Sequence, residues 1–262
     1  MLTKQQPEQP VTVKLFACSL LFITGMTLST LLLASLIILT FPITFEYRYR
    51  IAQQWSRFNI WWLKKTCDID YRISGLEHVP ADAAIVVAKH QSTWETLFLQ
   101  QLLPPMAWVV KKELLWIPFF GWALALLNPI SINRQTSSVA VRQVLRQGKE
   151  HLDKGQWVLI FPEGTRTAPG IRRPYNIGGA MLAAHSGYPI LPVAHNAGEF
   201  WPRRGFIKHP GTIQVVFGPL TESYGRNARE LNVLVENWIE SMMQRISNVS
   251  ISSRQRDLAK TK

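Results

Sequence analysis

Short apolar runs alternate with amphipathic stretches along most of the chain, from about residue 70 to residue 247. The runs are rich in Val and Ile, which is typical of strands buried in a sheet. We expect strands at 71–74, 83–88, 106–110, 129–132, 157–161, 190–194 and 212–217, and helices at about 93–103, 136–153, 176–186 and 227–247. This alternation predicts an α/β fold with a largely parallel central sheet flanked by helices on both faces, which binds ligands at the carboxyl ends of its strands.

The N-terminal part of the chain differs, because residues 15–45 include no charged side chain. As one helix they would be about 46 Å long, against about 30 Å for the hydrocarbon core of a bilayer. The segment is too long for the apolar region of a signal peptide, and a buried core helix would need a much larger protein around it. We predict a membrane-embedded helical element that either tilts or breaks near Gly25 or Pro42 into a re-entrant pair.

Residues 46–66 are predicted to form a second helix with one apolar face. Its apolar residues recur at offsets of four, seven and eleven: Ile51, Trp55, Phe58 and Trp62. Arginine and lysine side chains surround this face, as in helices that lie among lipid headgroups, and packing on the domain core is the alternative. We expect a membrane or interfacial two-helix anchor, an α/β domain and a loose basic tail, at 1–66, 67–247 and 248–262.

The chain carries a formal charge of +12 and has an isoelectric point near 10.0, which indicates an anionic partner. Nucleic acid is a poor candidate, because the sequence has no helix-turn-helix, zinc or RNA-binding signature. Basic residues after the apolar segment outnumber those before it, so we expect the bulk of the chain on the cytoplasmic side of a membrane. Cys18 and Cys67 form no zinc-ligand or disulfide pattern, which favours a reducing compartment.

The stretch AKHQSTWET follows the second predicted strand and places His90 five positions before Glu95. With Ser92 as the N-cap of the next helix, Glu95 falls at N3, the spacing of a capping box. Capping alone would explain Glu95 but not His90. A carboxylate on one ring nitrogen would fix the tautomer and leave the other nitrogen as a base. Since the chain has no Gly-x-Ser-x-Gly elbow and no cysteine at a strand end, this base would act directly on a substrate hydroxyl.

Other polar residues follow neighbouring predicted strands. Pro162 and Gly164 favour a sharp turn that would present Glu163, Thr165 and Arg166 into the same crevice. A strand-end arginine and a strand-end lysine, Arg134 and Lys112, add positive charge, which suits phosphate. The remaining histidines have no metal-ligand spacing, and a structural role is expected for His195. With no P-loop, Gly-x-Gly-x-x-Gly or paired acidic cluster in the sequence, we expect no cofactor and no metal.

As a set, four blocks resemble those of the glycerolipid acyltransferase family, most of all its bacterial 1-acyl-sn-glycerol-3-phosphate acyltransferases. The blocks are His90-x4-Glu95, Ile132-Asn133-Arg134, Phe161-Pro162-Glu163-Gly164-Thr165-Arg166 and Leu191-Pro192-Val193. Their order and spacing match over roughly residues 70–220. The resemblance implies an acyltransferase domain at 67–247, anchored to the bacterial inner membrane by the N-terminal helices and facing the cytoplasm.

The resemblance also implies a reaction, in which an acyl group passes from acyl-CoA or acyl carrier protein to the 2-hydroxyl of lysophosphatidic acid, giving phosphatidic acid. By analogy His90 is the general base and Glu95 orients it. The residues implied to bind substrate are Lys112, Arg134, Glu163, Gly164, Thr165 and Arg166.

Two features depart from the family pattern. The family usually has aspartate where this chain has Glu95, and we expect activity to be kept. Lysines that often follow the third block are missing here, and Arg172 and Arg173 lie close by. Two alternatives stay open: an acyltransferase for another lysolipid, such as lyso-ornithine lipid, and a non-enzymatic membrane-anchored module that binds anionic lipid.

Overall fold

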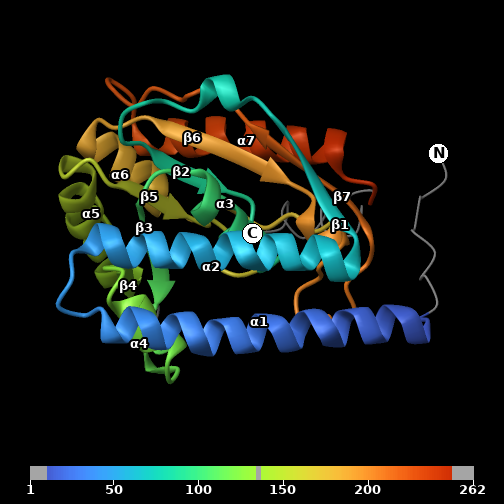
Figure 1. Ribbon diagram of the computed structural model, residues 1–262. Helices are drawn as coiled ribbons and strands as arrows, with labels where there is room; N and C mark the ends of the chain where they lie inside the picture. Colours follow the sequence, from blue (N-terminus) through green and yellow to red (C-terminus); the bar gives the residue numbers. More distant parts are fainter. Residues whose placement is uncertain (1–10, 134–136, 250–262) are drawn as a thin grey trace, which may run out of the picture.

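A seven-stranded sheet forms the middle layer of the protein (Figure 1). The computed structural model describes residues 11–133 and 137–249. The strands are β1 (Ile69–Ser74), β2 (Ile85–Ala88), β3 (Met106–Lys111), β4 (Ile130–Ile132), β5 (Trp157–Ile160), β6 (Ile190–His195) and β7 (Gly211–Phe217). Their spatial order is β1-β7-β6-β2-β5-β3-β4. All seven predicted strands are therefore confirmed, with ends that differ by one or two residues.

The sheet is largely parallel, as predicted. Five of its six strand pairings are parallel, and β6 pairs antiparallel with β7. Because β7 in turn pairs parallel with β1, these two strands run opposite to the other five. The carboxyl ends of β2, β3, β4, β5 and β6 consequently meet at one edge of the sheet.

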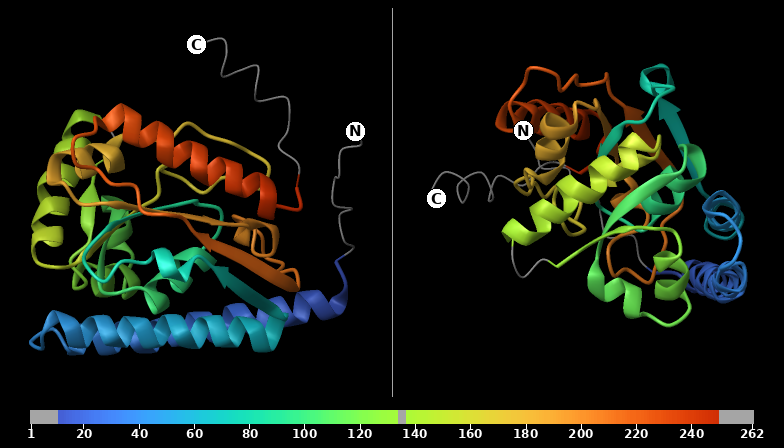
Figure 2. Two further views of the ribbon diagram at one scale, coloured as in Figure 1. Left: turned by 90° about the horizontal axis from the view of Figure 1, so that it is seen from above. Right: turned by 90° about the vertical axis from the view of Figure 1, so that its left-hand side faces the viewer.

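Helices cover both faces of the sheet, so that the protein has three layers (Figure 2). The helices are α1 (Val13–Leu39), α2 (Phe45–Cys67), α3 (Trp94–Leu102), α4 (Phe120–Ala125), α5 (Ser137–Asp153), α6 (Gly178–Ser186) and α7 (Ala228–Ile246). Short 3₁₀ helices are η1 (Leu76–His78), η2 (Lys112–Trp116) and η3 (Ala197–Glu199). The helices α5, α6 and α7 lie on one face; α3 and α2 lie on the other, with α1 packed along α2.

The central strands are buried from end to end. All four residues of β2 and all four of β5 are buried, which is why their sequences, IVVA and WVLI, are continuous apolar runs. The strand β7 instead alternates between buried and half-buried positions, as a strand with one less covered face does. The short helix α4 and the 3₁₀ helices were not predicted, because elements of three to six residues are too short to show a periodic pattern.

The N-terminal helices form an antiparallel pair. The first helix runs unbroken through Gly25, ends at Leu39, and the chain turns around Pro42 before α2 runs back along it. A side chain at Gly25 would collide with Trp62, so glycine allows the close approach of the two helices here. Of the two predicted breakpoints, the one near Pro42 is correct and the one near Gly25 is wrong.

Most of α1 is exposed, although it is strongly apolar. It is long and apolar enough to cross a membrane, with a mean hydropathy of 2.1 over its most apolar window, only 17% of which is buried. On α2, three of the four predicted face residues, Ile51, Trp55 and Trp62, pack against the core, while Phe58 is exposed. Most of that face therefore follows the packing alternative, and the exposed apolar surface of the helical pair belongs chiefly to α1.

Candidate active site

A cavity of about 1530 Å³ opens at the edge where the five strands end. His90 follows β2 and the segment 161–166 follows β5, its neighbour in the sheet, so the strand pairing itself brings these residues together. The opposite wall is apolar and comes from the N-terminal helix, α4 and α5: Leu33, Ala34, Ile37, Ala123, Leu124, Leu127, Val141 and Val144. The site thus combines polar strand ends with an apolar chamber that reaches α1.

The side chains of His90 and Glu95 are hydrogen-bonded. The Nδ1 atom of His90 donates to Oε1 of Glu95 at 2.8 Å. Since the carboxylate accepts at Nδ1, the Nε2 atom of His90 carries the free lone pair and can act as a base. The ring also stacks on Phe161, with ring centroids 3.9 Å apart and planes inclined by 12°. Two independent contacts therefore fix the orientation of the imidazole.

Glu95 serves the helix start at the same time. Its carboxylate accepts hydrogen bonds from the backbone N–H of Gln91 at 2.9 Å and from that of Ser92 at 2.8 and 3.0 Å. Burial opposes ionisation, but His195, His90 and the N–H of Ser92 more than offset it, so the pKa of Glu95 lies below its usual value. Capping and pairing with His90 are therefore compatible.

The predicted capping box is present at the start of α3. The hydroxyl of Ser92 accepts from the N–H of Trp94 at 3.2 Å, and the carboxylate of Glu95 accepts in return from the N–H of Ser92. Thr93, the residue directly before α3, already has helical backbone angles and makes no side-chain cap bond, so Ser92 is the residue that caps the helix. The prediction for Ser92 and Glu95 is therefore confirmed.

The segment after β5 forms the predicted sharp turn. The N–H of Gly164 donates to the carbonyl of Phe161 at 3.0 Å, and Gly164 has a φ of 68°, which glycine adopts readily. Further along, the backbone N–H of Thr167 and its hydroxyl both donate to the carbonyl of His90, at 2.8 and 3.1 Å. The two strand-end segments are thus joined directly beneath the cavity.

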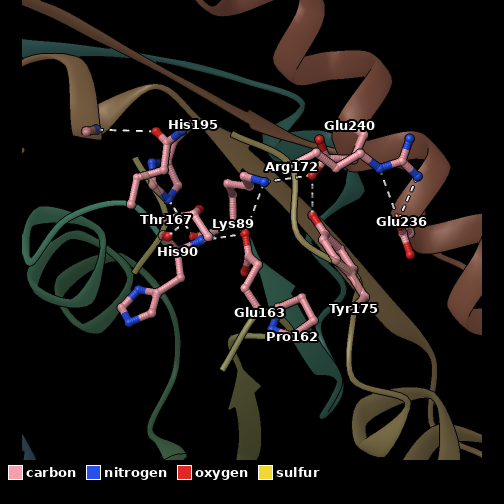
Figure 3. Close-up of polar contacts among 12 residues, drawn as sticks. Lys89, His90, Pro162, Glu163, Thr167, Arg172, Tyr175, His195, Glu236 and Glu240 are labelled. Atoms are coloured by element: carbon pink, nitrogen blue, oxygen red, sulfur yellow. Dashed lines mark hydrogen bonds and ion pairs between the residues drawn. The ribbon is translucent and has the colours of Figure 1, made fainter. Parts of the chain in front are cut away.

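Lys89, the residue before the histidine, is buried between two carboxylates (Figure 3). Its Nζ lies 2.7 Å from Oε1 of Glu240 on α7 and 3.1 Å from Oε1 of Glu163. The hydroxyl of Tyr175 donates to the same oxygen of Glu240 at 3.0 Å. One ammonium group therefore ties the ends of β2 and β5 to a helix that is 151 residues away in the chain.

Burial opposes charge throughout this cluster. It raises the pKa of Glu163 more than Lys89 lowers it, and the Oε2 atom of Glu163 is buried with no hydrogen-bond partner in the described part of the chain. Burial, and after it the carboxylates of Glu163 and Glu240, raise the pKa of Tyr175, which stays a neutral donor. The contact of Lys89 with Glu240 is the shorter of its two ion pairs.

The structure brings most of the predicted residues to one place. The residues His90, Glu163, Gly164, Thr165 and Arg166 line the cavity, and Glu95 lies behind His90. Lys112 does not line it; the preceding residue, Lys111, does, because successive side chains at a strand end point to opposite sides.

Two further arginines were considered as phosphate ligands. Arg134 lies outside the described residues. Arg172 pairs with Glu236 on α7 at 2.6 Å, so it adds no charge to the cavity.

His195 has the structural role that was expected. It is buried, its Nε2 donates to the carbonyl of Lys89 at 2.7 Å, and its Nδ1 accepts from the N–H of Ala197. Burial lowers its pKa, which favours this neutral form. Among residues 11–133 and 137–249, no three His, Cys, Asp or Glu side chains are grouped so that they could hold a metal ion.

Two groups of residues around the cavity were not predicted. Lys89, Tyr175 and Glu240 are far apart in sequence, and no motif links them. Arg203 and Arg204, from the connection between β6 and β7, also line the cavity. The sequence contains a signal for the second group only: the turn-forming dipeptides in Trp-Pro-Arg-Arg-Gly place two basic residues in a turn after a strand.

Comparisons with known proteins match most of the chain. The model of the Acyltransferase family matches residues 70–196. The chain is 48% identical to a 1-acyl-sn-glycerol-3-phosphate acyltransferase of Pseudomonas aeruginosa, over 78% of this chain and 81% of the relative. It is 27% identical to the chloroplastic 1-acyl-sn-glycerol-3-phosphate acyltransferase BAT2 of Brassica napus, over 94% of this chain and 72% of the relative.

A solved structure has the same fold. The crystal structure of 1-acyl-sn-glycerophosphate (LPA) acyltransferase from Thermotoga maritima superposes with a TM-score of 0.73 over 87% of this chain and 94% of that one, at 22% sequence identity. The sheet and its N-terminal helices therefore have a precedent among experimental structures.

The buried ion pair generates a stability prediction. Lys89→Met leaves Glu240 as an uncompensated buried charge, and we expect it to lower the free energy of unfolding by about 3–5 kcal/mol. Lys149→Met is the matched control, because Lys149 and Asp153 also lie 2.8 Å apart but are exposed on α5. That change should cost less than about 0.5 kcal/mol. Chemical denaturation of both variants measures the difference, and equal losses would contradict the assignment of Lys89.

Proposed function

This chain belongs to the acyltransferase family that includes the 1-acyl-sn-glycerol-3-phosphate acyltransferases, and we propose that it acylates lysophosphatidic acid. In this reaction a fatty acyl group passes from a thioester donor, acyl-CoA or acyl carrier protein, to the free 2-hydroxyl of the acceptor. The products are phosphatidic acid and a free thiol.

The imidazole of His90 carries this proposal. It is held by Glu95 through Nδ1, it stacks on Phe161, and it lies at the wall of a cavity with the segment 161–166 beside it. A histidine oriented in this way, with a second nitrogen that has no hydrogen-bond partner among the described residues, is the arrangement of a general base. The apolar chamber beyond it has the character that an acyl chain needs.

The chemistry follows from these residues. Nε2 of His90 accepts the proton of the 2-hydroxyl while its oxygen attacks the thioester carbonyl, and Glu95 stabilises the imidazolium that forms. The tetrahedral intermediate collapses with cleavage of the C–S bond, and His90 returns the proton to the departing thiolate. Arg166, half-buried beside the base, supplies positive charge for the substrate phosphate. No covalent acyl-enzyme is needed.

The N-terminal helices attach the domain to the membrane. The exposed face of α1 is apolar along the length of the helix, and a water-exposed patch of that size is unfavourable. We assign residues 1–66 as the anchor of the α/β domain at 67–247, on the cytoplasmic face of the bacterial inner membrane. The charge distribution of the sequence supports this orientation.

Removal of the base tests the proposed reaction. We expect His90→Ala to lower the rate of phosphatidic acid formation from lysophosphatidic acid and acyl-CoA by about 10²- to 10⁴-fold. Circular dichroism and membrane sedimentation should be unchanged. Near-normal turnover would refute the role of His90, and incorporation into a different lysolipid by the unaltered protein would refute the acceptor.

Glu95 separates the enzyme from the binding-module alternative. A glutamine at this position has a single carbonyl oxygen to replace the carboxylate that accepts from His90, Gln91 and Ser92. We expect Glu95→Gln to reduce turnover by about 10²-fold and Glu95→Asp by less, since aspartate keeps the charge with a shorter reach. A non-enzymatic lipid-binding module predicts instead that lipid binding is the same in both variants and in the unaltered protein.

The segment from η2 to α4 forms an apolar rim between the cavity and α1. Phe120, Ala123 and Leu124 line the cavity, while Trp116 and Trp122 are 71% and 51% exposed. The rim packs beside the C-terminal half of α1, where Figure 1 shows α4 next to that helix. Its tryptophans are suited to the interfacial region of a bilayer, so a lipid acceptor can reach the cavity from the membrane plane.

The rim can be tested with acceptors presented in two ways. We expect the double variant Trp116→Ser, Trp122→Ser to acylate long-chain lysophosphatidic acid in vesicles about tenfold more slowly, because the rim no longer enters the bilayer. With a short-chain acceptor below its critical micelle concentration, the rate should be unchanged. Tyr224→Ser is the control, since Tyr224 is 92% exposed in the loop before α7, on the other side of the sheet from α1. Equal losses with both acceptors would contradict this role.

A further inference from the structure

A tight turn at Pro202–Gly205 lies at the mouth of the cavity. The N–H of Gly205 donates to the carbonyl of Pro202 at 3.0 Å, which closes the turn. Its two middle residues, Arg203 and Arg204, are exposed and line the cavity together with Arg166. Nothing in the four sequence blocks includes this turn.

The backbone of the turn is strained. Arg204 has a φ of 62°, in the left-handed region that glycine adopts at little cost and arginine does not. Glycine occupies the next position, Gly205, where a side chain would collide with Pro202. Glycine is therefore needed at position 205 for the close contact with Pro202, whereas the left-handed position, 204, is occupied by arginine. Strain of this kind persists only where the surrounding structure holds it in place, and it clusters at functional sites.

The turn also gathers like charges. Arg203 donates from Nη1 to the carbonyl of Arg166 at 2.8 Å, which holds the two residues together. Burial lowers the pKa of Arg166; the charge of Glu95 opposes this shift, and the charge of Arg203 adds to it. Within residues 11–133 and 137–249, none of the three arginines has a carboxylate at ion-pair distance. Such a cluster is unfavourable without an anion and favourable with one.

Contacts on both sides of the turn place it against the membrane helix. Trp201 packs edge-on against Phe22 of α1 at 5.1 Å, and Phe206 stacks on Phe16 at 5.0 Å. The N–H of Lys208 donates to the hydroxyl of Ser19 at 2.9 Å. The arginines are thus held between the apolar anchor and the cavity, where a lipid headgroup meets water.

We propose that Arg203 and Arg204 bind the phosphate monoester of the lipid acceptor together with Arg166 and so contribute to its affinity. The proposal rests on the proposed function and adds a binding element outside the four blocks. A phosphate monoester also occurs in CoA, and a phosphate diester in the prosthetic group of acyl carrier protein, so the source of the phosphate needs its own test.

Steady-state kinetics of the full chain in phosphatidylcholine vesicles distinguish the two sources. We expect Arg203→Gln and Arg204→Gln each to raise the KM for lysophosphatidic acid about tenfold, with kcat changed less than twofold and the KM for acyl-CoA unchanged. Arg229→Gln, an exposed arginine on α7, should change neither constant. A rise in the KM for acyl-CoA alone would overturn the assignment to the acceptor, and unchanged constants would overturn the site.

Arg204→Gly separates binding from folding. Because glycine relieves the left-handed strain, we expect the Tm to stay the same or to rise by up to about 2 °C, while the KM for lysophosphatidic acid still rises about tenfold. A variant with an unchanged KM would show that Arg204 is only a surface residue.

A binding measurement keeps this inference apart from the proposed function. Isothermal titration with a short-chain lysophosphatidic acid, below its critical micelle concentration, should show about tenfold weaker binding to Arg203→Gln than to the unaltered protein. Failure of the unaltered protein to acylate any acceptor would refute the proposed function and leave this result standing. Equal binding to both proteins would refute the phosphate site.

Discussion

The ammonium group of Lys89 has to be neutralised where it lies, because it is 2% exposed and an unpaired charge at that depth costs several kcal/mol. Glu163 reaches it from the end of β5, and Glu240 reaches it from α7. Both carboxylates must therefore keep their places for the protein to be stable. Since His90 follows Lys89 directly, the same requirement fixes the backbone that presents His90 at the cavity, so folding itself positions the histidine that we propose as the base.

The carboxylate of Glu95 is a second buried charge that needs partners. It is buried, so its charge must be met by donors, and the nearest donors are the N–H groups at the start of α3 and the ring of His90. The histidine is one of several groups that satisfy the carboxylate. The longer side chain of glutamate folds back to the ring nitrogen because the N–H groups of Gln91 and Ser92 hold its carboxylate there.

The sequence predicted what depends on local pattern. Buried strands such as 157–160 are continuous apolar runs, and the turn after them contains proline and glycine, so both were predictable from neighbours in the chain. The contact of Lys89 with Glu240 joins residues 151 positions apart. The sequence around Lys89 does not reveal whether its side chain is buried or exposed to solvent, so this contact could not be predicted. The capping box of Ser92 and Glu95, by contrast, was predictable, since both partners lie close together in the chain. Lys111 and Lys112 could not be told apart, because which of the two side chains faces the cavity depends on where β3 ends.

The strained arginine in the β6–β7 connection shows what a pattern of residue types leaves out. The turn is held on both sides by α1, through Trp201 and Phe206, and α1 is the apolar helix that is long enough to cross a membrane. The positive charge at the cavity mouth is thereby tied to the position of α1. If α1 is the anchor that we propose, its depth in the bilayer also sets the position of the guanidinium groups relative to the lipid headgroups.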